Sequence, residues 1–334
     1  MKIYKVGGAV RDELLGLQPT DTDWLVVGSS IKEMAELGYK QVGNNFPVFL
    51  HPETNEEYAL ARREIKSGQG HKDFEFIFTP DVTIEEDLSR RDLTINAMAK
   101  DSHGELIDPF NGQTDLENKV FKHVSDAFYE DPLRALRVAR FKAQLPTFDI
   151  HESTKDALKT ISKTGELGCL SSERVWGEVT KGLSSKFDEF LTVIKDYDLS
   201  EPWFSGIENI PNFKSDIPEI KWCEMAEANN FKFAQHLKIP KTYSKQLAMW
   251  EKFSNYKINE DINYKIDFYR DFTNNTFKSA IYTLQFFPSI EKECVPIIEE
   301  YVNFNFGEIN AQRKNNIDTA KIEELKKIIE KHDK

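Results

Sequence analysis

Two neighbouring stretches decide the fold of this chain: Lys5-Val6-Gly7-Gly8-Ala9-Val10-Arg11-Asp12 and, soon after it, Asp21-Thr22-Asp23-Trp24. Residues 3–6 read as a strand that meets two glycines, and a short helical pattern carrying Arg11 follows. The two carboxylates of the second stretch then open another apolar run, residues 25–27. The order is strand, glycine turn, helix and an acidic strand.

The spacing of the two carboxylates indicates a metal site. Successive side chains of a strand point to opposite faces, so Asp21 and Asp23 are expected on one face with their oxygens close together. Hard cations such as Mg²⁺ take oxygen ligands and usually keep substrate phosphates in their coordination shell. By itself an Asp-x-Asp pair is more often a solvated strand end or a helix cap.

The glycines and Arg11 indicate a phosphate cradle beside that site. Gly7 and Gly8 lack a Cβ, so the backbone can approach a triphosphate closely, and the helix that follows offers N–H donors and a favourable dipole end. Arg11 adds a planar fork of donors that fits phosphate. A pair of glycines alone is more often only a turn, but together the two stretches predict a nucleotidyl-transfer site.

Composition bounds the class of protein. The chain has 334 residues, of which 40% are hydrophobic and 30% charged, which suits two or more globular domains. It has no apolar run long enough to span a bilayer and its first residues lack the apolar core of a secretory signal, so we expect a cytoplasmic protein that does not enter a membrane. An odd number of widely spaced cysteines excludes a disulfide framework and a cysteine zinc site, and we interpret all three as packing residues: Cys169, Cys223 and Cys294.

The net charge of −12 argues against a nucleic-acid protein, because duplex binders usually carry a basic surplus. The objection is weaker for an enzyme that grips a small region of RNA through local basic side chains.

Secondary-structure patterns divide the chain in two. The first ~120 residues alternate short strand and helix patterns, and from about Asp126 onward the pattern is helical. The stretch Ser200 to Pro218 reads as a connection. The predicted helices are 132–141, 154–161, 172–183, 187–194, 243–253 and 320–331.

A second constellation is Arg90-Arg91-Asp92-Leu93-Thr94-Ile95-Asn96-Ala97. Asp92 is suited to cap the short helical pattern that follows it. Alone, the segment reads as a solvated basic turn. Beside a metal-binding strand, Arg91 is expected to contact a triphosphate and Asn96 to hydrogen-bond a nucleotide or a loop.

The third constellation is residues 130–141, which begin Glu130-Asp131-Pro132. Pro132 suits a first helical position, which makes an N-cap the plain role for Asp131. Arginines then recur at every third position, and a solvated helix face would normally mix charges of both signs. The helix therefore presents a row of guanidinium groups with a carboxylate at its start: Arg134, Arg137 and Arg140.

These ordered motifs resemble those of class II, bacterial-type CCA-adding tRNA nucleotidyltransferases, of the DNA polymerase β-like superfamily. The resemblance is dense over residues 1 to about 145, weaker through Ser172-Glu173-Arg174-Val175-Trp176-Gly177-Glu178, and faint later, where Leu237-Lys238-Ile239-Pro240 is the clearest similarity.

The resemblance implies an α+β fold in which a nucleotidyltransferase head with a mixed sheet precedes an all-α neck, body and tail. The expected bounds are 1–122 for the head, 123–198 for the neck and 199–334 for the body and tail. The implied reaction adds C, C and A to the 3′ end of tRNA from CTP and ATP, with contacts to the acceptor stem and elbow. The implied site comprises Asp21 and Asp23 as ligands of two Mg²⁺ ions, Gly8, Arg11, Arg91, Arg137 and Arg140 on phosphates and sugar, Asp131 and Arg134 on the base edge, and Gly7, Asp92, Asn96 and Glu130 in support.

The base-reading assignment also has a chemical reason. Cytosine and adenine both show an exocyclic amine donor next to a ring-nitrogen acceptor, whereas uracil and guanine show a carbonyl oxygen and a ring N–H. A carboxylate beside a guanidinium fits the first pair and opposes the second, and unpaired buried polar groups can reject a substrate by as much as ~10⁴-fold.

Three expectations bound the function further. Ala61 to Glu75, with Gly68 and Gly70, takes the place of the family's flexible loop, which favours full CCA synthesis. The seven histidines are scattered, so no HD phosphohydrolase domain is expected. The alternatives are a poly(A) polymerase of the same superfamily, for which the chain lacks an extended basic tail, and a non-catalytic RNA-binding descendant.

Overall fold

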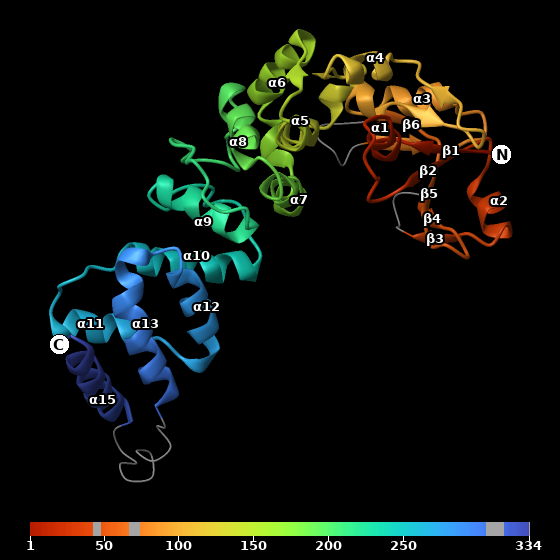
Figure 1. The fold of residues 1–334 in the computed structure, drawn as a ribbon. Coiled ribbons are helices and arrows are strands. Elements are labelled where there is room, and N and C mark those ends of the chain that lie inside the picture. Colours follow the sequence, from red (N-terminus) through yellow and green to blue (C-terminus); the bar gives the residue numbers. More distant parts are fainter. Residues whose placement is uncertain (43–47, 67–73, 305–316, 334) are drawn as a thin grey trace. The chain divides into compact units, whose positions relative to one another are not determined.

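The computed structural model describes residues 1–42, 48–66, 74–304 and 317–333 (Figure 1). They form two compact units, the first Met1–Asn212 with Ala234–Lys238 and the second Phe213–Phe233 with Ile239–Lys334. The sequence predicts a boundary near residue 198, whereas the compact unit that contains the head and neck runs on to Asn212.

The N-terminal part of the first unit is built on a mixed sheet of seven described strands in the order β3-β4-β5-β2-β1-β8-β9. Neighbours pair antiparallel except β2 and β5, which are parallel. A separate antiparallel pair, β6 with β7, follows β5 in the chain. The strands are β1 Lys2–Val6, β2 Asp23–Val27, β3 Lys40–Val42, β4 Val48–Leu50, β5 Glu57–Leu60, β6 Arg63–Lys66, β7 Phe74–Ile77, β8 Ala99–Lys100 and β9 Leu106–Ile107.

The central hairpin explains where β2 begins. β1 ends at Val6, which pairs with Asp23, because Gly7 at φ +72° turns the chain out of the sheet and into helix α1. Residues before Asp23 therefore have no β1 residue to pair with. The prediction that Asp21 also lies in the strand is wrong for this reason.

Short helices pack with this sheet and fix the segments that carry polar side chains. Helix α3 begins with a capping box between Thr83 and Glu86. Gly112, at the start of α4, lies so close to η1 that an added Cβ would sit 2.2 Å from the Thr94 carbonyl oxygen. These elements are α1 Gly8–Leu14, α2 Ile31–Glu36, α3 Ile84–Ser89, the 3₁₀ turn η1 Thr94–Asn96 and α4 Gly112–Glu117.

The rest of the first unit is helical apart from one short parallel pair, β10 Val120–Phe121 with β11 Asp149–Ile150. Helix α5 packs against both α7 and α8, and Phe187, Phe190 and Leu191 of α8 are fully buried. The elements are η2 Asp126–Glu130, α5 Leu133–Gln144, α6 Glu152–Thr164, η3 Glu166–Cys169, α7 Ser172–Leu183 and α8 Phe187–Asp196.

The second unit contains only helices among its described elements. Its core is rich in aromatic side chains, and the Tyr269 hydroxyl, fully buried, donates to Cys294 Sγ at 3.2 Å. Proline stands at the start of two of these helices, at Pro218 and Pro288. They are α9 Pro218–Ala228, α10 Lys241–Ser254, α11 Ile262–Tyr269, α12 Asn274–Leu284, α13 Pro288–Asn303 and α15 Ile317–His332.

The α+β fold class is confirmed: a mixed sheet with helices comes first and helices follow. All six predicted helices are present, each with its ends no more than three residues from the expected positions, and the stretch from 200 to 217 is a connection. Four further helices of the second unit, α9, α11, α12 and α13, had no predicted counterpart. No helix in the described ranges is both long and apolar enough to cross a bilayer.

Two of the three cysteines are buried, as predicted, but Cys169 is exposed. It closes the 3₁₀ turn η3, whose buried residue is Leu167. The interpretation of Cys169 as a packing residue is therefore wrong.

Candidate functional site

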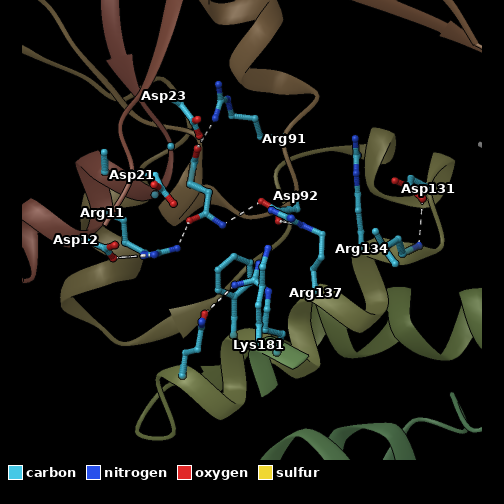
Figure 2. Close-up of a pocket in the computed structure, with 18 of the residues that line it drawn as sticks. Arg11, Asp12, Asp21, Asp23, Arg91, Asp92, Asp131, Arg134, Arg137 and Lys181 are labelled. Carbon is cyan, nitrogen blue, oxygen red and sulfur yellow. Dashed lines mark hydrogen bonds and ion pairs between the residues drawn. The ribbon is translucent and has the colours of Figure 1, made fainter. Parts of the chain in front are cut away.

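A cavity of about 790 Å³ lies in the first unit, between the glycine turn of α1, the start of β2, the segment 90–96 and helices α5 and α7 (Figure 2). Its lining brings together residues that are more than 150 positions apart in the sequence. The lining residues are Gly7, Gly8, Ala9, Arg11, Asp12, Thr20, Asp21, Asp23, Arg62, Arg90, Arg91, Asp92, Asn96, Asp131, Leu133, Arg134, Arg137, Arg140, Phe141, Gln144, Arg174 and Lys181.

Asp21 and Asp23 line this cavity together, with Asp23 as the first residue of β2. Both side chains are exposed, and neither carboxylate has a hydrogen bond or ion pair to another residue that the structure describes. The charge of Asp23 favours the ionised form of the nearby Arg91 guanidinium. Two carboxylates with uncommitted oxygens at one cavity suit a hard divalent cation, which binds few protein ligands and completes its shell with water and phosphate oxygens.

Within the described ranges no group of three or more His, Cys, Asp or Glu side chains is arranged to hold a metal ion. A cation at Asp21 and Asp23 would have two carboxylates from this part of the chain, and Mg²⁺ in nucleotide sites commonly adds water and phosphate oxygens.

The glycine turn is shaped around Arg91. Gly7 adopts φ +72°, and a Cβ there would sit 2.8 Å from Arg91 Nη1, so a side chain is excluded by both conformation and space. Arg11, one turn into α1, donates to Asp12 at 2.7 Å and to the Asn96 amide oxygen at 2.7 Å. The turn thus holds two guanidinium groups beside the backbone of Gly8.

Asp87 anchors the arginines on the head side of the cavity. Its fully buried carboxylate accepts from Arg90 at 2.7 Å and from Arg91 at 3.4 Å, and it also accepts the Arg62 amide at 3.3 Å. Burial alone would raise the pKa of Asp87, but the charges of Arg90 and Arg91 hold it below its ordinary value. The carboxylate is therefore ionised and fixes the positions of these basic groups.

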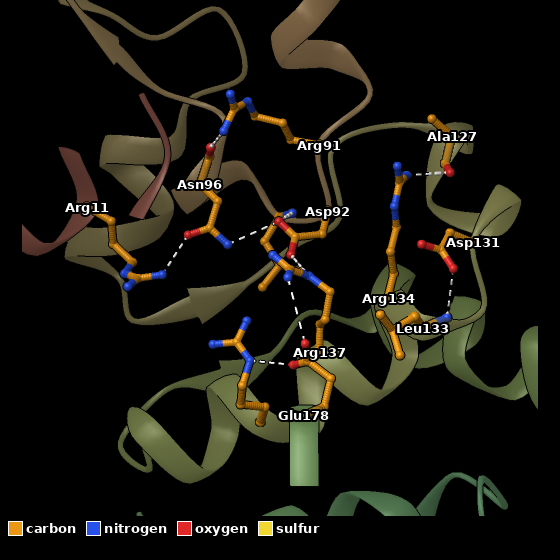
Figure 3. Close-up of polar contacts among 12 residues, drawn as sticks. Arg11, Arg91, Asp92, Asn96, Ala127, Asp131, Leu133, Arg134, Arg137 and Glu178 are labelled. Carbon is orange, nitrogen blue, oxygen red and sulfur yellow. Dashed lines mark hydrogen bonds and ion pairs between the residues drawn. The ribbon is translucent and has the colours of Figure 1, made fainter. Parts of the chain in front are cut away.

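Asp92 joins head and neck through a second buried network (Figure 3). Its carboxylate accepts from Arg137 Nε at 2.6 Å, from Asn96 Nδ2 at 3.1 Å and from the Leu93 amide at 2.8 Å. Burial opposes ionisation, yet Arg137 and these donors hold the pKa of Asp92 far below its usual range. The prediction that Asp92 caps the following helical turn is wrong: the cap position is Leu93, and the Asp92 carboxylate is taken up by Arg137 and Asn96.

Glu178 of α7 anchors the far end of the arginine row. It accepts from Arg140 Nε at 2.5 Å and lies 3.9 Å from Arg137 Nη1, with all but 5% of its surface buried. Arg140 also donates to Gln144, and its guanidinium lies 3.7 Å from the centre of the Phe141 ring. The network therefore runs without a break from Arg11 to Gln144.

Asp131 lies at the other end of α5. One oxygen accepts the Leu133 amide at 3.2 Å, and both oxygens face Arg174, at 3.3 and 2.7 Å. Arg134 donates to the Ala127 carbonyl oxygen, which orients its side chain along the start of α5. The N-cap position of α5 is Pro132, so the predicted N-cap role of Asp131 is wrong in position, although its carboxylate accepts the amide of the first helical residue and faces the cavity.

The structure brings together every predicted site residue except one. Glu130 ends the turn η2 and is not part of the cavity lining. The predicted row of arginines on one face of α5 is confirmed, because all three line the cavity. The proposed loop, Ala61 to Glu75, has its centre, residues 67–73, outside the described residues.

Sequence reasoning missed the residues that organise these groups. Arg174, Glu178 and Lys181 recur at helical spacing on one face of α7, a signal that was available in the sequence. Asp87 gave no such signal, since an acid in the first turn of a helix is ordinary.

The cavity lining has nine basic side chains and five carboxylates, a local excess of positive charge in a chain whose net charge is −12. Such a concave basic surface attracts polyanions regardless of the overall charge. The objection from net charge therefore does not apply at this site.

Comparison with known proteins agrees with this geometry. Residues 3–122 match the family described as poly A polymerase head domain. The multifunctional CCA protein of Vibrio vulnificus is 54% identical over 226 residues, which are 66% of this chain and 56% of that protein. That of Ectopseudomonas mendocina is 53% identical over 66% of this chain and 55% of its own length. The chain thus spans just over half the length of these relatives.

Solved structures show the same fold. The CCA-adding enzyme of Bacillus stearothermophilus in complex with CTP is 19% identical with a TM-score of 0.66, over 98% of this chain and 88% of that one. The Thermotoga maritima CCA-adding enzyme complexed with tRNA is 21% identical with a TM-score of 0.63, over 99% and 87%. Residues 3–122 of the chain therefore match a poly A polymerase head domain, and the chain has the fold of the CCA-adding enzymes.

Proposed function

We propose that this chain adds C, C and A to the 3′ end of tRNA, using CTP and ATP and releasing pyrophosphate. The observation that carries the proposal is one cavity that holds Asp21 and Asp23 on one side and Asp131 and Arg134 on the other, with arginines between them. The similarity to multifunctional CCA proteins supports the same reaction.

Asp21 and Asp23 are the residues that would hold Mg²⁺, with two ions as the expected number. When bound there, Mg²⁺ lowers the pKa of the RNA 3′-hydroxyl and neutralises charge on the triphosphate and the leaving pyrophosphate.

The arginines bind and orient the nucleotide. Arg11 and Arg91, beside the Gly7–Gly8 backbone, face the position of the phosphates, while Arg137 and Arg140 continue the positive surface toward the sugar. Because Asp87, Asp92 and Glu178 fix Arg91, Arg137 and Arg140 before substrate arrives, little side-chain entropy is lost on binding.

Asp131 and Arg134 choose the base. The Asp131 carboxylate accepts the exocyclic amine of cytosine or adenine, and Arg134 donates to the adjacent ring nitrogen. Uracil and guanine would place a carbonyl oxygen against the carboxylate and a ring N–H against the guanidinium, which leaves buried polar groups unpaired. One protein edge therefore accepts both correct bases.

The partner is tRNA, gripped at its acceptor stem and elbow through shape and backbone rather than sequence. The relative solved with tRNA bound has the same fold over nearly the whole chain, which supports this partner. Three cysteines without a disulfide in the described chain agree with a cytoplasmic site of action.

The test is to supply tRNA lacking its 3′ end with CTP alone, ATP alone or both, with Mg²⁺, and to sequence the products. We expect two C residues with CTP alone and complete CCA with both. ATP-only tailing of arbitrary RNA would instead identify a poly(A) polymerase, which the name of the head family keeps as the second candidate. Incorporation that does not need Mg²⁺ would refute the metal site.

Products from both nucleotides also test the role of Ala61 to Glu75. Arrest after CC would show that this segment does not support the switch to A addition.

A further inference from the structure

The base-reading carboxylate is held by a second arginine that the sequence did not single out. Arg174 points both terminal nitrogens at Asp131, with Nη1 3.3 Å from Oδ1 and Nη2 2.7 Å from Oδ2. Both side chains are largely shielded, with 28% and 15% of their surfaces exposed. A two-point contact of this kind fixes the plane of a carboxylate as well as its position.

The helix that carries Arg174 is itself held in place. Arg174 lies in the first turn of α7, where its amide donates to the Ser171 hydroxyl that caps the helix. Helix α7 packs against α5, which starts beside Asp131, and the Glu178 to Arg140 ion pair ties the same two helices together one turn further on. The guanidinium of Arg174 is thus supported by two rigid helices.

We propose that Arg174 is a positioning residue for base selection: it orients the Asp131 carboxylate so that cytosine and adenine fit and uracil and guanine do not. This inference rests on the proposed function. The Leu133 amide contacts only one Asp131 oxygen, so this hydrogen bond by itself does not fix the plane of the carboxylate. The fork of Arg174 fixes that plane, and a misdirected acceptor loses most of its power to discriminate.

Arg174 acts through Asp131 rather than on the base. Its terminal nitrogens are directed at the carboxylate, whereas Arg134, on α5, is the guanidinium assigned to the ring nitrogen of the base. A direct contact between Arg174 and the base is the rival explanation, and the experiment separates the two.

The first measurement compares kcat and KM for CTP and UTP on tRNA that lacks its CCA end, for wild type, Arg174→Ala and Arg174→Lys. We expect Arg174→Ala to lower the ratio of kcat/KM for CTP over UTP by about 10- to 100-fold, the effect of losing one charge-assisted contact. Arg174→Lys keeps the charge without the fork and should restore only part of the ratio. Glu173→Gln, an exposed neighbour on α7, is the matched control and should leave the ratio unchanged.

The second measurement is a double-mutant cycle with Asp131→Ala. If Arg174 acts through Asp131, adding Arg174→Ala to Asp131→Ala changes the ratio no further. An additional loss in the double variant would show that Arg174 reads the base itself and would overturn the inference. Thermal unfolding of each variant excludes a general loss of folding.

The outcomes also separate this inference from the proposed function. A wild-type protein that completes CCA while Arg174→Ala keeps the full CTP preference overturns only the role of Arg174. A wild-type protein that adds neither C nor A to tRNA overturns the proposed function first.

Discussion

Two sets of carboxylates lie in or beside the cavity, and they differ in almost every physical respect. Asp21 and Asp23 are exposed and have no hydrogen-bond or ion-pair partner among the described residues. Asp87, Asp92 and Glu178 are buried, and each is paired with one or two arginines. The comparison indicates that the first set is available to ligands while the second set holds the arginines in place.

The difference has opposite consequences for activity and stability. Removing an exposed, unpaired carboxylate costs the fold little. Removing a buried partner leaves uncompensated guanidinium groups and costs several kcal/mol. Variants of Asp21 and Asp23 should therefore lose activity but keep their stability, whereas variants of the buried carboxylates should lose stability.

The largest effect is expected for Asp21→Asn and Asp23→Asn. Each removes a proposed metal ligand, which should lower nucleotide transfer by about 10⁴-fold or more, since metal ions stabilise such transition states by several kcal/mol. The midpoint of urea unfolding should remain at the wild-type value and tRNA binding should persist. If either variant still incorporated nucleotides, the exposed pair would not be the metal ligands that we propose.

Asp87→Ala should destabilise the fold by about 3 to 5 kcal/mol, because Arg90 and Arg91 lose their buried counter-charge. Urea unfolding followed by tryptophan fluorescence measures the loss. Glu85→Ala, an exposed acid on the same helix, is the control and should change stability far less. Equal stability of the two variants would show that Asp87 does not organise these arginines.

Asp92→Asn should lower stability by about 2 kcal/mol at pH 7, and the deficit should shrink in acid. The pKa of Asp92 is depressed in the folded protein, so its ionised form stabilises the fold at every pH above the unfolded value of about 3.9. That contribution decreases progressively as the pH falls from this value toward the much lower folded pKa, so the difference between the two proteins should narrow below about pH 4. Unfolding free energies of both proteins between pH 3 and 7 test this, and a constant difference would contradict it.

The smallest effect is expected for Glu36→Ala, which removes an exposed ion pair to Lys32 on helix α2. Such pairs contribute at most a few tenths of a kcal/mol, because solvent screens them and both side chains lose entropy in forming them. Unfolding at low and high salt should barely separate this variant from wild type. A large loss would mean that surface and buried ion pairs do not differ in this chain as proposed.

Much of the cavity follows from local patterns in the sequence. The glycine turn, the Asp-x-Asp pair and the arginines of α5 are each contained in a short segment, so spacing alone predicts them. The face of α5 was predicted correctly because a period of three residues in a helix keeps side chains on one side.

The organising residues could not be predicted in the same way, because their roles exist only between segments. Asp87 meets arginines three and four positions on, but Asp92 meets Arg137 and Asp131 meets Arg174 across 45 and 43 positions. From its sequence neighbours alone, Asp92 is expected to cap the following turn. In the structure its carboxylate instead forms the long-range ion pair with Arg137. The helices α9, α11, α12 and α13 of the second unit were not predicted either.

The short parallel pair β10 with β11 also bears on how such proteins can be divided. Val120 and Phe121 lie at the end of the matched head family, yet they pair with Asp149 and Ile150, beyond helix α5. A fragment that stops at residue 122 would lose this pairing and expose Phe121, which is fully buried. Recombination that exchanges head domains between relatives should therefore give a folded protein only when the exchanged segment extends past residue 150. The segment that can be exchanged as a unit is thus set by the pairing of β10 with β11 and not by the end of the matched family.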